Sequence, residues 1–231
     1  VLLWSIMAAL PSVAQTITVG TGTSITAANE AGNVIYRSSA ASAFNFSQSV
    51  QLYRSTDLAA LPSGSTVTAI AFNKTTVSTL VAGRTATLNI YLKNTSTTAL
   101  ASGTAFGTLT TGATLVYSNS AVNNTVIPNT AGFWTIPFTT NFSYAGGSIE
   151  VYVDWSINAG AGSPTTGAFQ WQFTPVTQFQ AMGNQNSIPL GPTNAVYGTQ
   201  LRMMNAQFTY TPPPPCTATP TPGNTTGPAL V

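Results

Sequence analysis

The feature that most constrains the fold of this chain is an alternation of apolar and polar residues with a period of two. It is clearest at 87–93 and 148–155, where aliphatic or aromatic side chains occupy every second position. Successive side chains of a β-strand point to opposite faces, so the pattern predicts strands with one buried and one solvated face. At 169–173 the aromatic rings are expected on one face and the glutamines on the other. Further strands are predicted at 50–54, 67–73, 115–118, 132–138, 200–204 and 206–211.

Clusters of Gly, Pro, Ser and Asn separate these segments, at 62–64, 145–147 and 158–164. Many short strands with such turn signals between them are typical of an antiparallel sandwich. The sequence therefore predicts an all-β fold, an antiparallel β-sandwich of jelly-roll-like type. A single helical turn is expected at 55–61, with Ser55 or Thr56 as its cap, and no other segment has a helical period.

Charged residues make up only 4% of the 231 residues, and histidine is absent, whereas roughly 25% of an average soluble domain is charged. The six basic residues are scattered, so we expect no surface for nucleic acid or an anionic membrane. Without histidine, Ser-His-Asp and Cys-His catalysis in their usual forms and His-ligated zinc are excluded. We therefore expect a chain that is not an enzyme and that has no cofactor.

A pair of carboxylates is the one catalytic arrangement that this composition leaves open. Glu150 and Asp154 share a face of one predicted strand, with α-carbons about 13 Å apart. The carboxyl groups of glycosidases are roughly 5–9.5 Å apart. A pairing of either residue with Glu30 or Asp57 through the fold stays open.

The N-terminal segment is typical of the end of a signal peptide. Its first ten residues are apolar, and small residues follow up to Gln15, which predicts cleavage near Ala14 or Gln15. A buried first strand is the alternative. The apolar run is shorter than the roughly 20 residues that span a bilayer, so we expect no membrane insertion of the mature domain. The prediction is a secreted, extracellular or cell-surface protein.

Three regions follow from these signals. Residues 1–15 are expected to be a signal-peptide remnant, 16–211 the sandwich domain, and 212–231 a Pro/Thr-rich linker with the start of a further domain. Cys216 is the only cysteine and lies in the last region, so its partner is expected beyond Val231.

Aromatic side chains are the strongest remaining candidates for ligand binding, because their rings stack on apolar surfaces. Trp155 and Trp171 are in phase with apolar neighbours, so they are expected in the core. Tyr91 and Tyr152 are out of phase with theirs and are expected to be exposed and available to a ligand.

Asp154 shares its predicted face with Tyr152 and completes the set of predicted ligand-binding residues, Tyr91, Tyr152 and Asp154. Asp154 is also the best candidate for a weak calcium site, together with the carbonyl groups of 158–162. Such a site usually needs several carboxylates, so no metal site is predicted.

Several segments, in their order along the chain, resemble modules of large secreted surface proteins of Bacteroidota. They are QLYRSTDL at 51–58, GSTVTAIAFN at 64–73, LNIYLKNTS at 88–96, TLVYS at 114–118, AGFWTIPF at 131–138 and FSYAGGSIEV at 142–151. The segment CTATPTPGNT at 216–225 is similar to the start of an Ig-like or fibronectin-type repeat. The resemblance covers about residues 35–211. It implies a jelly-roll-like module of a multidomain protein, exported often by type IX secretion, and supplies no catalytic residues.

Together these observations predict an extracellular, non-catalytic binding or adhesion module of a larger secreted surface protein. An accessory carbohydrate-binding domain of a secreted hydrolase and a structural spacer are the alternatives. The expected partners are a polysaccharide, another glycan, or a host or matrix surface protein, bound by a monomeric module.

Overall fold

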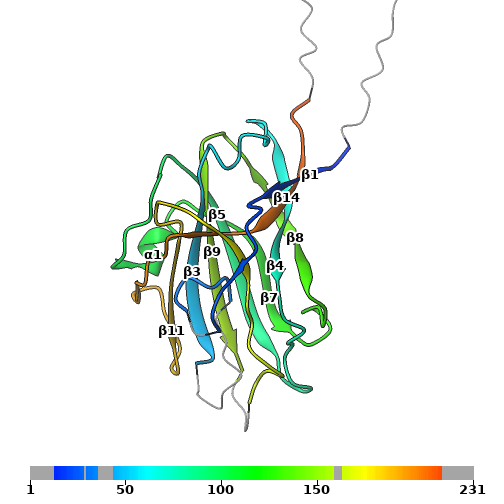
Figure 1. The fold of residues 1–231 in the computed structure, drawn as a ribbon, viewed down its shortest axis with the longest axis vertical. Helices are drawn as coiled ribbons and strands as arrows, with labels where there is room; N and C mark the ends of the chain where they lie inside the picture. The colour runs from blue at the N-terminus through cyan, green and yellow to red at the C-terminus, as the bar shows by residue number, and fades with distance from the viewer. Residues whose placement is uncertain (1–12, 29, 36–43, 159–162, 215–231) are drawn as a thin grey trace, which may run out of the picture.

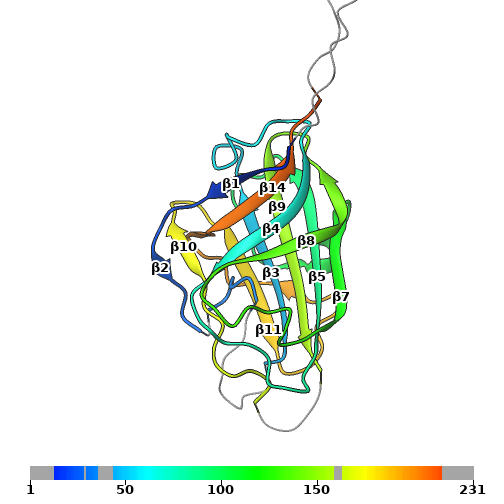
Figure 2. The same ribbon diagram turned by 90° about the vertical axis from the view of Figure 1, so that its right-hand side faces the viewer.

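Two antiparallel sheets pack face to face in the computed structural model, which describes residues 13–28, 30–35, 44–158 and 163–214 (Figures 1 and 2). The predicted all-β antiparallel sandwich of jelly-roll-like type is confirmed. The four-stranded sheet consists, in spatial order, of β1 (Gln15–Val19), β14 (Ala206–Thr211), β4 (Thr66–Lys74) and β8 (Gly132–Ser143). The five-stranded sheet consists of β11 (Ala181–Asn186), β3 (Phe46–Tyr53), β9 (Ser148–Ile157), β5 (Ala86–Thr95) and β7 (Thr114–Val122).

Smaller elements close the edges and one outer surface of this sandwich. A three-stranded sheet lies beside β3 and β4, on the side of the sandwich away from β7 and β8 (Figure 2). It consists of β13 (Arg202–Met204), β10 (Gln172–Pro175) and β2 (Ser24–Ile25). A two-stranded sheet of β12 (Ala195–Val196) and β6 (Thr104–Ala105) is followed by the helix α1 (Phe106–Leu109). Within the described part of the chain, no helix has the length and apolar character that a membrane crossing requires.

The main core lies between the two large sheets, and β9 shows why the alternation predicted it. Val151, Val153 and Trp155 are each at most 1% exposed and stand opposite aliphatic residues of β5. Trp171 is fully buried in the same core, and its Nε1 donates a 3.0 Å hydrogen bond to the Ile35 carbonyl. The expectation that Trp155 and Trp171 are core residues is therefore confirmed.

Two glycines make the tight turn between β8 and β9 possible. Gly146 and Gly147 have φ of +91° and +85°, a region that side-chain-bearing residues rarely adopt. A β-carbon on Gly147 would also lie 3.1 Å from the Thr95 carbonyl oxygen. The turn predicted at 145–147 is therefore correct.

The predicted helical turn at 55–61 is only partly right. The segment forms consecutive turns rather than a helix, with an amide-to-carbonyl bond from Leu58 to Arg54. Asp57, rather than Ser55 or Thr56, caps it, by accepting a 2.9 Å bond from the Arg54 amide. The helix α1 was not predicted, because four residues are too few to show a helical period.

The two ends of the sandwich domain lie side by side. β1 and β14 are antiparallel neighbours, and Gln15 at the start of β1 stands opposite Tyr210 near the end of β14 (Figure 1). The boundary predicted at residues 15 and 16 falls at the start of β1. The rest of the predicted signal remnant up to residue 12, and Cys216 with its tail, lie outside the described residues.

Candidate functional site

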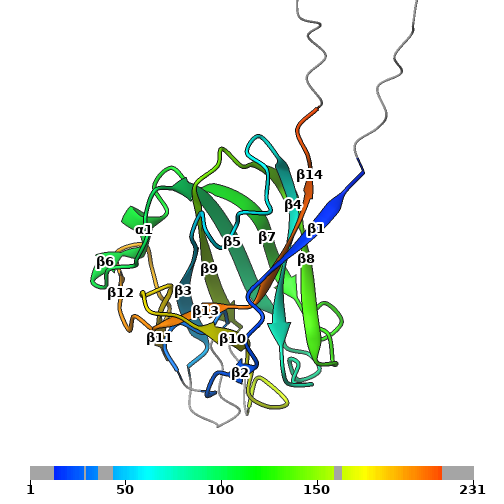
Figure 3. The same cartoon turned by 45° about the horizontal axis from the view of Figure 1, so that its top comes forward.

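The outer face of the five-stranded sheet, which points away from the four-stranded sheet, carries a second apolar cluster. α1, β6 and β12 lie over this face (Figure 3). The buried members of the cluster are Val50, Leu52, Leu100, Phe106, Tyr152, Met182 and Val196. Backbone bonds from Phe106 to the Asn194 carbonyl (2.9 Å) and from Gly107 to the Pro192 carbonyl (2.8 Å) hold α1 in place.

Tyr152 belongs to this cluster, so its predicted exposure is wrong. Its side chain is 0% exposed, and the Phe106 ring packs on it edge to face with centroids 6.2 Å apart. The alternation placed Tyr152 on the face opposite the main core, as observed. That face is covered, however, by a segment distant in the sequence.

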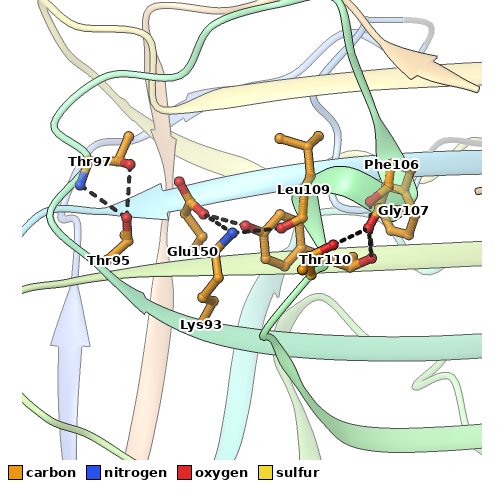
Figure 4. A network of polar contacts seen from close by, with 10 residues as sticks. Lys93, Thr95, Thr97, Phe106, Gly107, Leu109, Thr110 and Glu150 are labelled. Atoms are coloured by element: carbon orange, nitrogen blue, oxygen red, sulfur yellow. Dashed lines mark hydrogen bonds and ion pairs between the residues drawn. The ribbon is translucent and has the colours of Figure 1, made fainter.

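A small ionic network lies beneath this cover (Figure 4). Lys93 Nζ lies 3.3 Å from Glu150 Oε2, donates a 2.6 Å bond to the Leu109 carbonyl and lies 5.2 Å from the centroid of the Tyr152 ring. The Tyr152 hydroxyl donates to Glu150 Oε2. Burial first, and then this bond to Glu150, raise the pKa of Tyr152. Glu150 Oε2 is thus in contact with both Lys93 and Tyr152 within the fold.

Asp154 lies on the same outer face, one row further along the sheet. Its strand neighbours are Gln48 on β3 and Asn89 on β5. Gln48 Nε2 lies 3.4 Å from Asp154 Oδ1. Burial raises the pKa of Asp154, while the bonds from Gln48 and Asn89 act in the opposite direction.

A depression of about 180 Å³ opens beside Asp154. Its floor is the sheet itself, through Gln48, Tyr91 and Asp154, and its walls are α1 and the loop at 190–192. The two walls approach closely, since a β-carbon on Gly107 would lie 2.9 Å from the Pro192 side chain. The full lining is Gln48, Tyr91, Phe106, Gly107, Thr110, Asp154, Leu190, Gly191 and Pro192.

Two of the three predicted ligand-binding residues therefore meet in one place. Tyr91 is half-buried and packs against Phe106 with ring centroids 6.5 Å apart. Burial and the nearby Asp154 carboxylate raise the pKa of Tyr91. Tyr152 lies beneath the cover and is not among the lining residues.

The remaining lining residues could not be found from the sequence. Gln48 lies on β3, of which only the part from residue 50 was predicted. Phe106 and the loop at 190–192 carry no motif. The sequence holds one signal for this face: Asn89 lies in phase with Tyr91 on the predicted strand. In the structure Asn89 stands opposite Asp154, so the two form a polar row.

The depression brings together few ionisable side chains. One carboxylate and one half-buried ring lie together, and Glu150, the other carboxylate on this strand face, is bound to Lys93. Among the described residues, no group of three or more His, Cys, Asp or Glu could hold a metal ion. The loop proposed to complete a calcium site falls largely outside the described residues, and the Asn158 carbonyl accepts a 3.1 Å bond from Arg84.

A second hollow, of about 260 Å³, lies where β7 meets β8. Its lining includes Tyr117, Val126, Trp134 and Ile136, with Asn119 among the polar members. It contains no charged residue, and the Asn119 amide already donates to the Tyr117 hydroxyl at 3.2 Å. The depression at Asp154 is the better candidate, because it combines an aromatic ring with a charge.

Comparison with known proteins gives little further information. No protein-family model matches the chain, and no curated protein matches it. Among solved structures, a chain in the structure of the infectious bursal disease virus Gt strain is similar, with 14% sequence identity and a TM-score of 0.20. The match covers 87% of the present chain and 39% of the viral chain. A likeness at this level carries no functional argument.

Proposed function

We propose that this chain is an extracellular, non-catalytic module of a larger surface protein and that it holds a glycan in the depression beside Asp154. One observation carries the proposal: Tyr91 and Asp154 meet in a hollow built on the central strands of a sheet. A ring offers an apolar face for a sugar, and a carboxylate accepts hydrogen bonds from its polar groups. The resemblance to modules of secreted Bacteroidota surface proteins supports the extracellular setting.

The small volume of the depression favours a polymeric ligand of which a single sugar unit enters the hollow. Its volume is about 180 Å³, below the roughly 300–1,000 Å³ of pockets that enclose a whole small molecule. A polymer of which a single unit enters the hollow fits this size better than a free small molecule. The same site would serve an adhesin or an accessory domain of a hydrolase.

The position of the chain ends argues against an in-line spacer. β1 and β14 are antiparallel neighbours, so the first and last strands begin and end at the same end of the sandwich. Domains joined there would be attached side by side, and the module would project from the chain instead of lengthening it. A projecting module presents its surfaces to a partner.

The test is a glycan array, run with a panel of host matrix proteins, on the purified domain. The wild-type chain should bind at least one glycan, and Tyr91→Ala and Asp154→Asn should each weaken that binding. Tyr197→Ala is the matched control, because Tyr197 is 56% exposed and does not line the depression. Thermal melts of each variant establish that it is folded.

Two results would contradict the proposal. The first is a folded wild-type domain that binds no glycan on the array, which would favour the spacer. The second is glycan binding that survives Tyr91→Ala and Asp154→Asn but is lost in Tyr197→Ala, which would move the site to another surface.

A further inference from the structure

We propose that the glycan unit held in this depression carries a free amino group, and that Asp154 binds it as an ammonium ion. This inference rests on the proposed function and names its ligand class, an amino sugar that is not N-acetylated. The juxtaposition that carries it is a carboxylate that has no cation among the described residues, beside an aromatic ring and a buried amide oxygen without a hydrogen-bond partner there.

The charges of the described residues single out Asp154. The other three acidic residues each have a basic partner: Asp57 pairs with Arg54 at 3.1 Å, Glu150 with Lys93 at 3.3 Å, and Glu30 with Arg202. Asp154 has no ion-pair partner in the part of the chain that the structure describes. A half-buried carboxylate without a cation is costly, since burial disfavours its charged form.

The hydrogen bonds around Asp154 show what a ligand must supply. Gln48 Nε2 lies 3.4 Å from Asp154 Oδ1 and 3.5 Å from the Gly191 carbonyl oxygen, both long for strong bonds. Gln48 is 2% exposed, and its Oε1 has no hydrogen-bond partner among the described residues. Besides the bonds that Asp154 receives from Gln48 and Asn89, one buried amide oxygen, Gln48 Oε1, is thus left without a donor among the described residues. A ligand that brings donors and positive charge complements this oxygen and the carboxylate.

Tyr91 provides the second half of an ammonium site. Cations are attracted to the faces of aromatic rings, and more strongly where water is partly excluded. The fold shows the same chemistry nearby, where Lys93 Nζ lies 5.2 Å from the centroid of the Tyr152 ring and 3.3 Å from Glu150 Oε2. Asp154 and Tyr91 repeat this combination of carboxylate and tyrosine without the lysine.

Other glycans fit this site less well. An acidic sugar would bring a second negative charge to Asp154, and a neutral sugar would leave its charge uncompensated. The chain as a whole has a formal net charge of +2. A cationic glycan is therefore not drawn to the protein by its overall charge, so binding would report on a local site.

The experiment compares three tetrasaccharides with the same β-1,4 linkage that differ only at carbon 2. They are built from glucosamine, N-acetylglucosamine or glucose, and binding is measured by calorimetry at neutral pH and low salt. The glucosamine form should bind the wild-type domain about tenfold or more tightly than the other two, as expected for a charge-assisted contact. The preference should shrink at high salt, because the contact is only half-buried.

Asp154→Asn should lower affinity for the glucosamine form to about that of the neutral form. Asp57→Asn is the control, because it changes the charge of the chain equally but lies outside the depression; it should keep the preference. If Asp154→Asn fails to fold in thermal melts, Asn89→Ala, which removes a hydrogen bond to Asp154 but keeps its carboxylate, should still bind the glucosamine form preferentially, and loss of that preference in a folded Asn89→Ala would overturn the inference.

Each outcome separates this inference from the function on which it rests. If the wild-type domain binds the three tetrasaccharides equally, or if the preference survives Asp154→Asn, the amino-sugar inference is overturned. The proposal of a glycan-binding module would then still stand. Binding of none of them, with an empty glycan array, would overturn the proposed function as well. Binding of other glycans on the array, but none of these three, would overturn the amino-sugar inference alone.

Discussion

On its inner face, β9 presents aliphatic and indole side chains to the opposite sheet; on its outer face, the same strand presents Glu150, Tyr152 and Asp154. Both faces are covered, but the covers differ. The four-stranded sheet lies over the inner face, whereas a four-residue helix and loops lie over the outer one. The inner-face residues of β9, Val151, Val153 and Trp155, are apolar or aromatic, whereas the outer face retains a carboxylate at the rim of its cover.

The difference shows where a fold of this kind has room for a site. A sheet packed on a sheet leaves little space, because side chains of both surfaces interdigitate. A short helix and a loop cover a sheet only in part, and the gap between α1 and 190–192 is the depression at Asp154. Strands form the floor, while a short helix and a loop form the walls, an arrangement common in binding sites.

Removing the largest inner-face side chain should have the largest effect. Trp155→Ala is expected to lower the free energy of unfolding by roughly 3–5 kcal/mol, because the loss of a large core side chain leaves a cavity. Urea unfolding followed by fluorescence of the remaining tryptophans measures this. A cost below about 1 kcal/mol, typical of surface positions, would show that Trp155 is not a core anchor.

The outer face should prove to be a true second core. Tyr152→Ala is expected to cost about 3 kcal/mol, since the ring is fully buried against Phe106. Tyr152→Phe should cost only about 1 kcal/mol, because it removes the bond to Glu150 and keeps the packing. The same unfolding experiment measures the free energy of unfolding of both variants. A Tyr152→Ala variant as stable as the wild type would mean that the cover over the outer face of β9 is not stably formed.

Two lysines, Lys93 half-buried and Lys74 fully buried, extend the comparison to charge. Lys93 pairs with Glu150 on the outer face, so Lys93→Met should cost about 2 kcal/mol by leaving that carboxylate without its cation. Lys74, which follows Phe72 by two positions on β4, is 0% exposed and donates to the Thr76 and Pro128 carbonyls. Lys74→Met should be neutral or stabilising at neutral pH. Unfolding curves that rank the two variants in the opposite order would contradict this assignment.

The last prediction is a pH dependence of stability that comes mainly from Lys74. Burial lowers the pKa of Lys74 from 10.5 to about 8, so between these values the unfolded chain binds more protons than the folded chain. The free energy of unfolding should therefore rise by about 1.5 kcal/mol from about pH 8 to about 9.5. Above about pH 10 it should fall again, because burial raises the pKa of Tyr53 and Tyr152 and their ionisation then favours the unfolded chain.

The control for this prediction is Lys74→Met, which should lack the rise while keeping the fall at high pH. Urea unfolding at a series of pH values provides the measurement. A wild-type protein with constant stability from pH 8 to about 9.5 would show that Lys74 is solvated as well in the fold as in water.

Much of the main core could be predicted from the sequence, because its strands obey one simple rule. At β5 and β9 every second residue is apolar, and these residues fill the main core. β3 shows the limit of the rule. Its inner positions Ser49 and Gln51 are polar, so the strand was predicted only from residue 50, and both side chains donate to carbonyls of the segment at 30–35.

The candidate site was predictable only in part, for a related reason. Local alternation correctly placed Tyr91 and Asp154 on the outer face. It could not indicate that α1 and the loop at 190–192 cover that face, since those contacts join segments far apart in the chain. Tyr152 was therefore assigned to the surface although it is buried, and the walls of the depression were missed.

The adjacency of β1 and β14 has a consequence for mechanical load. If neighbouring domains pull on the two ends of this module, tension acts where Gln15 stands opposite Tyr210. The hydrogen bonds of that antiparallel pair are then stretched one after another, as in a zipper, and not together in shear. The five-residue strand β1 should peel away at low force, and single-molecule pulling through both ends would detect this as a short step before the main rupture. The five-stranded sheet that carries the depression is separate from the sheet that contains β1 and β14, so the depression should keep its shape after this first step.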